Sequence, residues 1–229
     1  QTSLGVLSVV HVAAYPLALK ALEQHGSAGA ASQLASNGEL IIGAALAAAA
    51  GLIVLAPQLA TVAVGQEFRT ATARLLPWIA IAATLGSVRA FHFDLAFHLS
   101  RDSWSLVACG VASALVNIGL NLWWIPRYGI EGAAYASVAA FALNLGLSIW
   151  LGRRVSCMPP VLPLLLRTGS LAIAVAIGAA CGGLVGAGLT GLAAGVLGGA
   201  LAAIVLALLI NLADVRTGVK LWLHARSVL

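Results

Sequence analysis

The chain has 229 residues, of which 61% are hydrophobic and only 8% are charged. A soluble domain carries roughly 25% charged residues, so a mean hydropathy of +1.02 leaves too little polar surface to cover a water-soluble globule. The formal net charge is +5, but the basic residues stand singly between apolar runs, which argues against a nucleic-acid partner. Three cysteines lie far apart without metal-ligand spacing, so neither a metal site nor a disulfide framework is indicated.

The apolar runs are unbroken and long enough for helices to cross about 30 Å of hydrocarbon. Barrel strands would instead alternate apolar and polar residues over roughly ten positions. We therefore expect an all-α, polytopic membrane protein with seven transmembrane helices, at residues 4–19, 40–64, 75–99, 106–125, 132–151, 161–185 and 189–212. The chain opens on Gln1 and enters an apolar run almost at once, so we expect a fragment that further sequence precedes.

The distribution of Lys and Arg predicts the orientation of these helices. One side collects eight basic residues, namely Lys20, Arg101, Arg153, Arg154, Arg167, Arg216, Lys220 and Arg226. The other side has three, namely Arg69, Arg74 and Arg127. The positive-inside rule places the richer side, and with it the C-terminus, in the cytoplasm. Five of the six tryptophans fall near predicted helix ends and the sixth, Trp222, lies in the tail, as expected for rings that prefer the headgroup boundary.

The last two predicted helices carry glycines at four-residue spacing, at positions 178, 182 and 186 and again at 191, 195 and 199. Small residues four apart form a groove that lets two helix backbones approach closely. This favours close packing of the two helices, while a lipid-facing groove is the alternative.

One segment, Asn117 to Ala134, reads NIGLNLWWIPRYGIEGAA. Pro126 should end the helix before it, and Gly129 permits a positive φ in the turn that follows. Glu131 suits a helix N-terminus, and Gly132 allows the next helix to pack closely. Spacing alone predicts a helical hairpin. Asn117, Asn121 and Asn144, like His11 in the first helix, are expected to hydrogen-bond between helices.

The wording of this segment resembles polysaccharide flippases of the multidrug/oligosaccharidyl-lipid/polysaccharide exporter superfamily, through an N-x3-N-x3-(I)P-x-YG-x2-GAA pattern. Its counterparts here are Asn117, Asn121, Pro126, Tyr128, Gly129 and Gly132. Two shorter segments are similar to the same family, Ala14-Tyr15-Pro16-Leu17 and Gly65-Gln66-Glu67-Phe68. The resemblance covers most of residues 1–154 and implies the same orientation as the charge count.

The resemblance implies that residues 1–154 form five helices of the C-terminal transporter bundle, whose N-terminal bundle is missing. Residues 155–212 would be two additional helices, and residues 213–229 a cytoplasmic tail. The tail mixes basic and apolar residues, which suits an interfacial helix, with a frayed tail as the alternative. The resemblance further implies a non-enzymatic flippase of the bacterial cytoplasmic (inner) membrane without a cofactor. Its partners would be the bilayer and an undecaprenyl-diphosphate-linked oligosaccharide. Proton or sodium coupling is plausible for the superfamily and is supported by no residue here.

The predicted helix at 75–99 contains several ionisable residues, which are functional candidates at membrane depth. Arg89 and His92, three residues apart, should share a face and attract a pyrophosphate in a central cavity that His11 also faces. The alternative for Arg89 is an intramembrane ion pair with an acidic residue of a neighbouring helix. Asp94 lies about 140° from Arg89 on an α-helix, so we expect it to pair with His98 or Arg101, or to carry a coupling proton.

Three rival functions stay open on the sequence. Another branch of the superfamily, either a drug/cation antiporter or a peptidoglycan-precursor flippase, would retain the fold, but a cation exporter would favour acidic cavity residues. A membrane enzyme of envelope glycan assembly would carry a large catalytic loop, whereas the predicted outside loops are short. A purely structural subunit would have no polar cavity.

Overall fold

The computed structural model describes residue 26 and residues 34–100, 102–155, 161–186 and 188–211. These residues are almost entirely helical, so the expected all-α class is confirmed. Within them, six helices are long and apolar enough to cross a membrane. The predicted helix at 4–19, with His11, and the tail at 213–229 lie outside the described residues.

The first described helix runs Leu34–Val54 and is followed, after a single turn residue, by α2 (Ala56–Ala63). One continuous helix was predicted at 40–64. The break falls at Leu55 because Pro57, which has no N–H to donate, sits in the first turn of α2. The earlier start is explained by Glu39, whose carboxylate accepts a 2.6 Å hydrogen bond from Arg167 Nη1 and so has a partner within the protein.

After a short 3₁₀ turn (Gln66–Phe68), α3 spans Arg69–Val88 and leads through a π-helical turn, η2 (Arg89–Phe93), into α4 (Leu95–Ser100). The remaining helices are α5 (Ser103–Tyr128), α6 (Ile130–Val155), α7 (Val161–Gly183) and α8 (Leu189–Leu209). α5 and α6 extend several residues beyond the predicted edges, because hydropathy detects only the part of a helix that matches the hydrocarbon.

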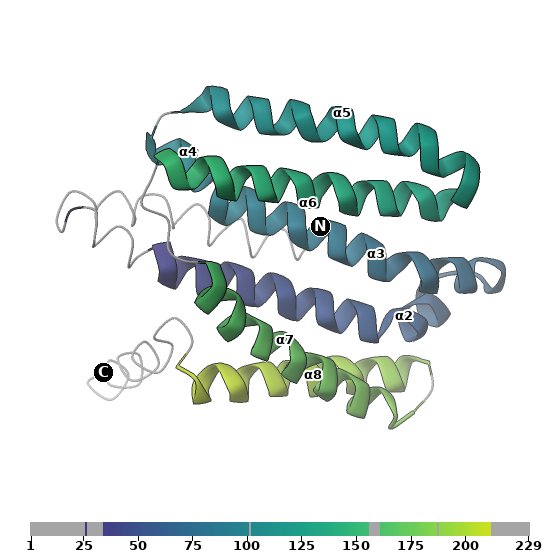
Figure 1. The fold of residues 1–229 in the computed structure, drawn as a ribbon. Coiled ribbons are helices and arrows are strands. Elements are labelled where there is room, and N and C mark those ends of the chain that lie inside the picture. Colours follow the sequence, from purple (N-terminus) through teal and green to yellow (C-terminus); the bar gives the residue numbers. More distant parts are fainter. Residues whose placement is uncertain (1–25, 27–33, 101, 156–160, 187, 212–229) are drawn as a thin grey trace, which may run out of the picture.

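The long helices lie in a row with their axes in roughly the same direction, from α5 at one edge through α6 and α3 to the Leu34–Val54 helix, with α7 and α8 beyond (Figure 1). α6 packs against both α5 and α3, and α7 packs against α8. Asp102 begins α5 by accepting the Ser105 N–H at 3.1 Å, which satisfies one of the unpaired N–H groups of the first turn.

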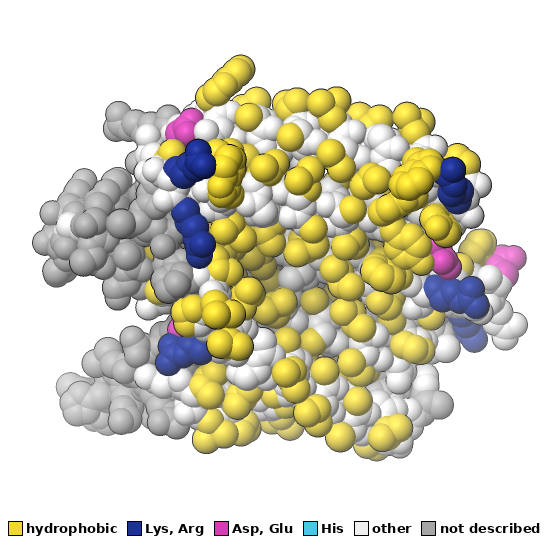
Figure 2. Space-filling view, in the orientation of Figure 1, with side chains coloured by type: hydrophobic (Ala, Val, Ile, Leu, Met, Phe, Trp, Pro, Cys, Tyr) yellow, Lys and Arg dark blue, Asp and Glu magenta, His cyan; other side chains and the backbone are white. Residues whose placement is uncertain are grey.

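Basic side chains gather on the two opposite sides of this row where the helices begin and end, and a broad hydrophobic band lies between them (Figure 2). The predicted grouping holds for the described arginines: Arg153 and Arg154 end α6, while Arg127 ends α5 at the opposite end. Each end also has an arginine over a tryptophan ring one turn away, Arg154 over Trp150 at 4.0 Å and Arg127 over Trp123 at 5.0 Å. This distribution is typical of helices that span a bilayer.

The α7–α8 hairpin is held by the predicted glycines. A Cβ on Gly178 would overlap the Gly198 carbonyl of α8, and one on Gly182 would overlap the Ala194 carbonyl. The two backbones therefore lie in direct contact, and the expectation of close packing is confirmed. Gly188, which starts α8, has a φ of 65°, a conformation that a side chain would strain.

The α5–α6 hairpin follows the prediction in part. Gly129 ends α5 with a φ of 59°, and Glu131 lies in the first turn of α6. A Cβ on Gly132 would lie 2.5 Å from the Trp124 carbonyl oxygen, so only glycine allows this close approach. The expectation that Pro126 ends its helix is wrong, because α5 continues to Tyr128. Pro126 lies in the last turn, where only one backbone hydrogen bond is lost.

Candidate functional site

The candidate site is centred on the π-helical turn at Arg89–Phe93, which interrupts the longest span. In this turn the Asp94 N–H donates to the Arg89 carbonyl at 2.9 Å, one residue further along the chain than in an α-helix. A π turn adds one residue without adding a turn, so residues five apart come to lie on the same face. Such bulges are frequent at functional sites.

The consequence is an ion pair that α-helical geometry did not predict. Arg89 Nη2 lies 3.4 Å from Asp94 Oδ2. The expectation that Asp94 points about 140° away from Arg89 is therefore wrong, because it assumed α-helical geometry throughout. Arg89 does form an ion pair, but its partner comes from its own helix rather than from a neighbouring one.

Asp94 is buried, and a second helix holds its carboxylate in place. Ser148 of α6 is fully buried and donates a hydrogen bond to Asp94 Oδ1 at 3.0 Å. Ser148 belongs to a stripe of buried residues at four-residue spacing along α6, namely Gly132, Ala136, Ala140, Asn144, Ser148 and Gly152. Because the stripe faces inward, the Arg89–Asp94 pair is tied to the helix packing. Sequence reasoning missed Ser148, although the small-residue spacing was visible.

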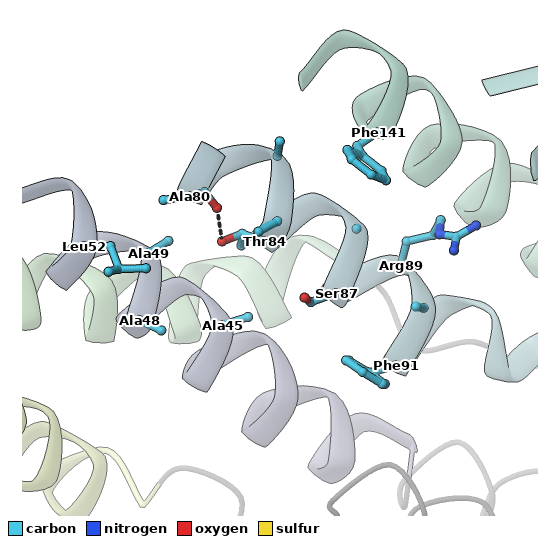
Figure 3. Close-up of a pocket in the computed structure, with 14 residues that line it drawn as sticks. Ala45, Ala48, Ala49, Leu52, Ala80, Thr84, Ser87, Arg89, Phe91 and Phe141 are labelled. Atoms are coloured by element: carbon cyan, nitrogen blue, oxygen red, sulfur yellow. Dashed lines mark hydrogen bonds between the residues drawn. The ribbon is translucent and has the colours of Figure 1, made fainter. Parts of the chain in front are cut away.

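Arg89 lines a cleft of about 400 Å³ between the Leu34–Val54 helix, α3 and α6 (Figure 3). The walls are mainly alanines, with Leu52, Phe91 and Phe141 as the large side chains. Thr84 adds little polarity because its hydroxyl donates to the Ala80 carbonyl at 2.8 Å. The cleft is thus an apolar hollow with one cationic side chain, and none of the described residues that line it is acidic.

Arg89 keeps hydrogen-bonding capacity that its ion pair does not use. Its side chain is 20% exposed, and its buried Nε–H has no hydrogen-bond partner in the described part of the chain. The contact with Asp94, at 3.4 Å, is longer than the 2.7–2.9 Å of a strong charge-assisted hydrogen bond. A guanidinium has five N–H donors, so an oxyanion in the cleft would find donors that the ion pair does not use.

His92 lies elsewhere. It is 1% exposed, its ring packs edge-to-face on Phe93 with centroids 4.7 Å apart, and a Cβ on Gly38 would overlap its imidazole. Neither ring nitrogen has a hydrogen-bond partner among the described residues. The structure therefore separates Arg89, in the cleft, from His92, which packs against the Leu34–Val54 helix, although α-helical spacing placed both on one face.

The asparagines of the hairpin segment bond along their own helix. Asn121 Nδ2 donates to the Asn117 carbonyl at 2.8 Å and to Asn117 Oδ1 at 3.0 Å, so the expected bond between helices is not what these atoms make. Asn144 is buried in the α6 stripe, and its Oδ1 accepts no hydrogen bond in the described structure. Three or more His, Cys, Asp or Glu residues that could share a metal ion are not found together within the described residues.

No family model matches this chain, and no match was found among curated proteins or solved structures. The structure places the chain in the class of all-α proteins with membrane-spanning helices. The resemblance of Asn117–Ala134 to flippases stays a prediction.

Proposed function

We propose that this protein is a transmembrane exporter that moves an undecaprenyl-diphosphate-linked oligosaccharide across the bacterial cytoplasmic membrane by alternating access. The N-terminal bundle that the resemblance implies would complete the transport path. In such transporters two helical bundles rock around a central site. The pattern from Asn117 to Gly132 and the long apolar helices support this class.

The observation that carries the proposal is the position of Arg89. It lies 20 residues after Arg69 and 11 before Ser100, which is about 30 Å and about 16 Å along the helix at 1.5 Å per residue. With the helix centred in the bilayer, Arg89 lies inside a hydrocarbon core about 30 Å thick. An arginine at that depth that faces a cleft is a functional candidate by default, because its charge is costly there.

The chemistry of the cleft favours an anionic substrate. Guanidinium is permanently charged, and its planar fork matches the oxygens of a phosphate. A diphosphate would compete with Asp94 for Arg89, while the alanine walls would contact apolar parts of the same molecule. A cation exporter is less well supported, because the carboxylate of Asp94 is engaged by Arg89 and Ser148.

The test must separate loss of function from loss of folding. Arg89→Ala would leave Asp94 buried without its counter-charge, so the informative variant is Arg89→Gln combined with Asp94→Asn, which keeps the pair neutral. We expect this double variant to reach the membrane at normal levels and to export surface glycan at least about tenfold less. Arg89→Lys keeps the charge but loses the planar fork. Its export should lie between that of the wild type and that of the double variant.

The measurement is the amount of surface glycan and of lipid-linked oligosaccharide retained in the cells that make the protein. Arg153→Gln is the matched control, because Arg153 is exposed at the end of α6, and its export should be normal. Wild-type export by a stably expressed double variant would contradict the assignment of Arg89 to the substrate site.

A further inference from the structure

A second hollow, lined largely by aromatic rings, lies on the side of the molecule where α5 ends and α6 begins. It has a volume of about 520 Å³, and its walls are formed by Trp78 of α3, Trp124 and Tyr128 of α5, and Tyr135 of α6, together with Val138 and Ala139. We call these four rings the aromatic pocket. It shares no lining residue with the cleft at Arg89.

Three of the four rings of the aromatic pocket contact one another edge to face. Trp78 and Tyr135 meet edge to face, with centroids 4.8 Å apart and planes at 79°. Tyr128 and Tyr135 do the same at 6.1 Å and 70°. Edge-to-face contact is a preferred geometry for aromatic pairs. Rings from three helices are therefore preorganised around one hollow.

The residues that line this hollow carry hydrogen-bonding groups. The Tyr135 hydroxyl donates to Glu131 Oε2 at 3.2 Å, which places a carboxylate beside the rings. The indole N–H groups and the Tyr128 hydroxyl add further donors. An apolar floor with a few convergent polar groups is the usual composition of a small-molecule site.

A comparison with the opposite ends of the helices shows a different arrangement of aromatic rings. There, Trp104 is 81% exposed and Trp150 is 54% exposed, and Trp150 stacks with Arg154 one turn along its own helix. Such single, outward rings are what the headgroup boundary attracts. Trp123 and Tyr128, near the pocket, are as exposed as Trp150, at 56% and 55%. The difference therefore lies in the edge-to-face contacts that Trp78, Tyr128 and Tyr135 make with one another.

The charged residues near the pocket distinguish between two kinds of ligand that aromatic rings bind, a cation and a sugar ring. A cation would need a negative surrounding, yet the described residues here carry three arginines (Arg69, Arg74 and Arg127) against two acids (Glu67 and Glu131). The second ligand is a pyranose ring, whose apolar C–H face stacks on an aromatic ring while its hydroxyls bond to the polar groups. We propose that the aromatic pocket binds a neutral pyranose unit of a glycan.

This inference rests on the proposed function insofar as the sugar belongs to the exported oligosaccharide. The positive-inside rule puts the helix ends near the pocket outside the cytoplasm. The pocket would therefore meet the glycan after the glycan has crossed the membrane. Its role would be to hold the saccharide on the exit side while the diphosphate leaves Arg89.

The experiment uses saturation-transfer difference NMR on the purified full chain in lipid nanodiscs. The probe is the free oligosaccharide that mild acid releases from the polyprenyl-linked pool of the same cells. With the wild-type protein we expect saturation transfer to the pyranose ring C–H protons. Trp78→Leu should weaken binding about tenfold, because an aromatic anchor in a pocket contributes much of the affinity. Tyr128→Leu, at an exposed position, provides a second variant if Trp78→Leu fails to fold.

Trp150→Leu is the matched control, since it removes an exposed indole at the opposite end, and its signal should equal that of wild type. The proposal is overturned if the wild type transfers no saturation to the glycan, if it transfers saturation only to lipid protons, or if both pocket variants bind as wild type does. The Arg89→Gln/Asp94→Asn variant should still bind the free glycan. Export that survives in that variant would refute the role of Arg89 and leave the pocket standing.

Discussion

The α3–α6 region and the α7–α8 hairpin pack their helices through different kinds of contact. Helices in a bilayer gain no hydrophobic energy by meeting, so they associate through close packing and polar contacts. In the hairpin, glycines such as Gly178 and Gly182 bring backbone against backbone. Between the π turn and α6, the Ser148 hydroxyl donates to Asp94, the carboxylate that pairs with Arg89. The difference is that the contact between the π turn and α6 uses a charged side chain, whereas the α7–α8 contact is made by the backbones.

The largest expected effect comes from breaking the Arg89–Asp94 ion pair. Asp94→Asn leaves the Arg89 guanidinium without its counter-charge, and loss of one partner of a buried pair costs about 3–5 kcal/mol. We expect a clearly lower Tm in detergent, and recovery of most of it when Arg89→Gln is added. If Asp94→Asn unfolds at the wild-type temperature, the pair does not stabilise the helix packing.

An intermediate effect comes from disturbing the backbone contact between α7 and α8. Gly182→Ala places a methyl group against the Ala194 carbonyl, and overpacking of this kind costs about 1–3 kcal/mol. Gly169→Ala is the control in the same helix, because a Cβ there meets nothing within 4 Å. The comparison is made by thermal unfolding of the two variants in parallel. Equal Tm values would mean that α7 and α8 are not in backbone contact.

The sequence predicted most of the helix spans and turns, but few of the contacts between side chains that lie far apart in the chain. Apolar run length located the spans, and the Gly129 and Gly178 patterns predicted a turn and a close contact, because these features are local. The Arg89–Asp94 pair depends on a π turn, and Asp94 also accepts a hydrogen bond from Ser148, 54 residues further along the chain. No periodicity within one helix can show such a turn. For the same reason His92 was grouped with Arg89, although it packs against Gly38.

The smallest expected effect lies outside both regions, at the start of α5. The hydrogen bonds from Ser105 lower the pKa of Asp102 below its usual value. A carboxyl group with a lowered pKa contributes stability above its unfolded pKa, and this is lost as the pH falls through the folded value. The wild-type Tm should therefore decline more than that of Asp102→Asn below about pH 4. Parallel Tm curves would show that the cap does not titrate with folding.

Transport by the purified full-length protein in liposomes is the most direct test of the central claim. Undecaprenyl-diphosphate-linked oligosaccharide is incorporated, and an added glycosidase reports how much of the initially protected glycan becomes accessible, with a proton gradient in one set and a sodium gradient in another. We predict that wild-type protein exposes the protected glycan in at least one set, whereas Arg89→Gln/Asp94→Asn stays at the level of protein-free liposomes. Wild-type liposomes that match protein-free ones under both gradients would contradict the account.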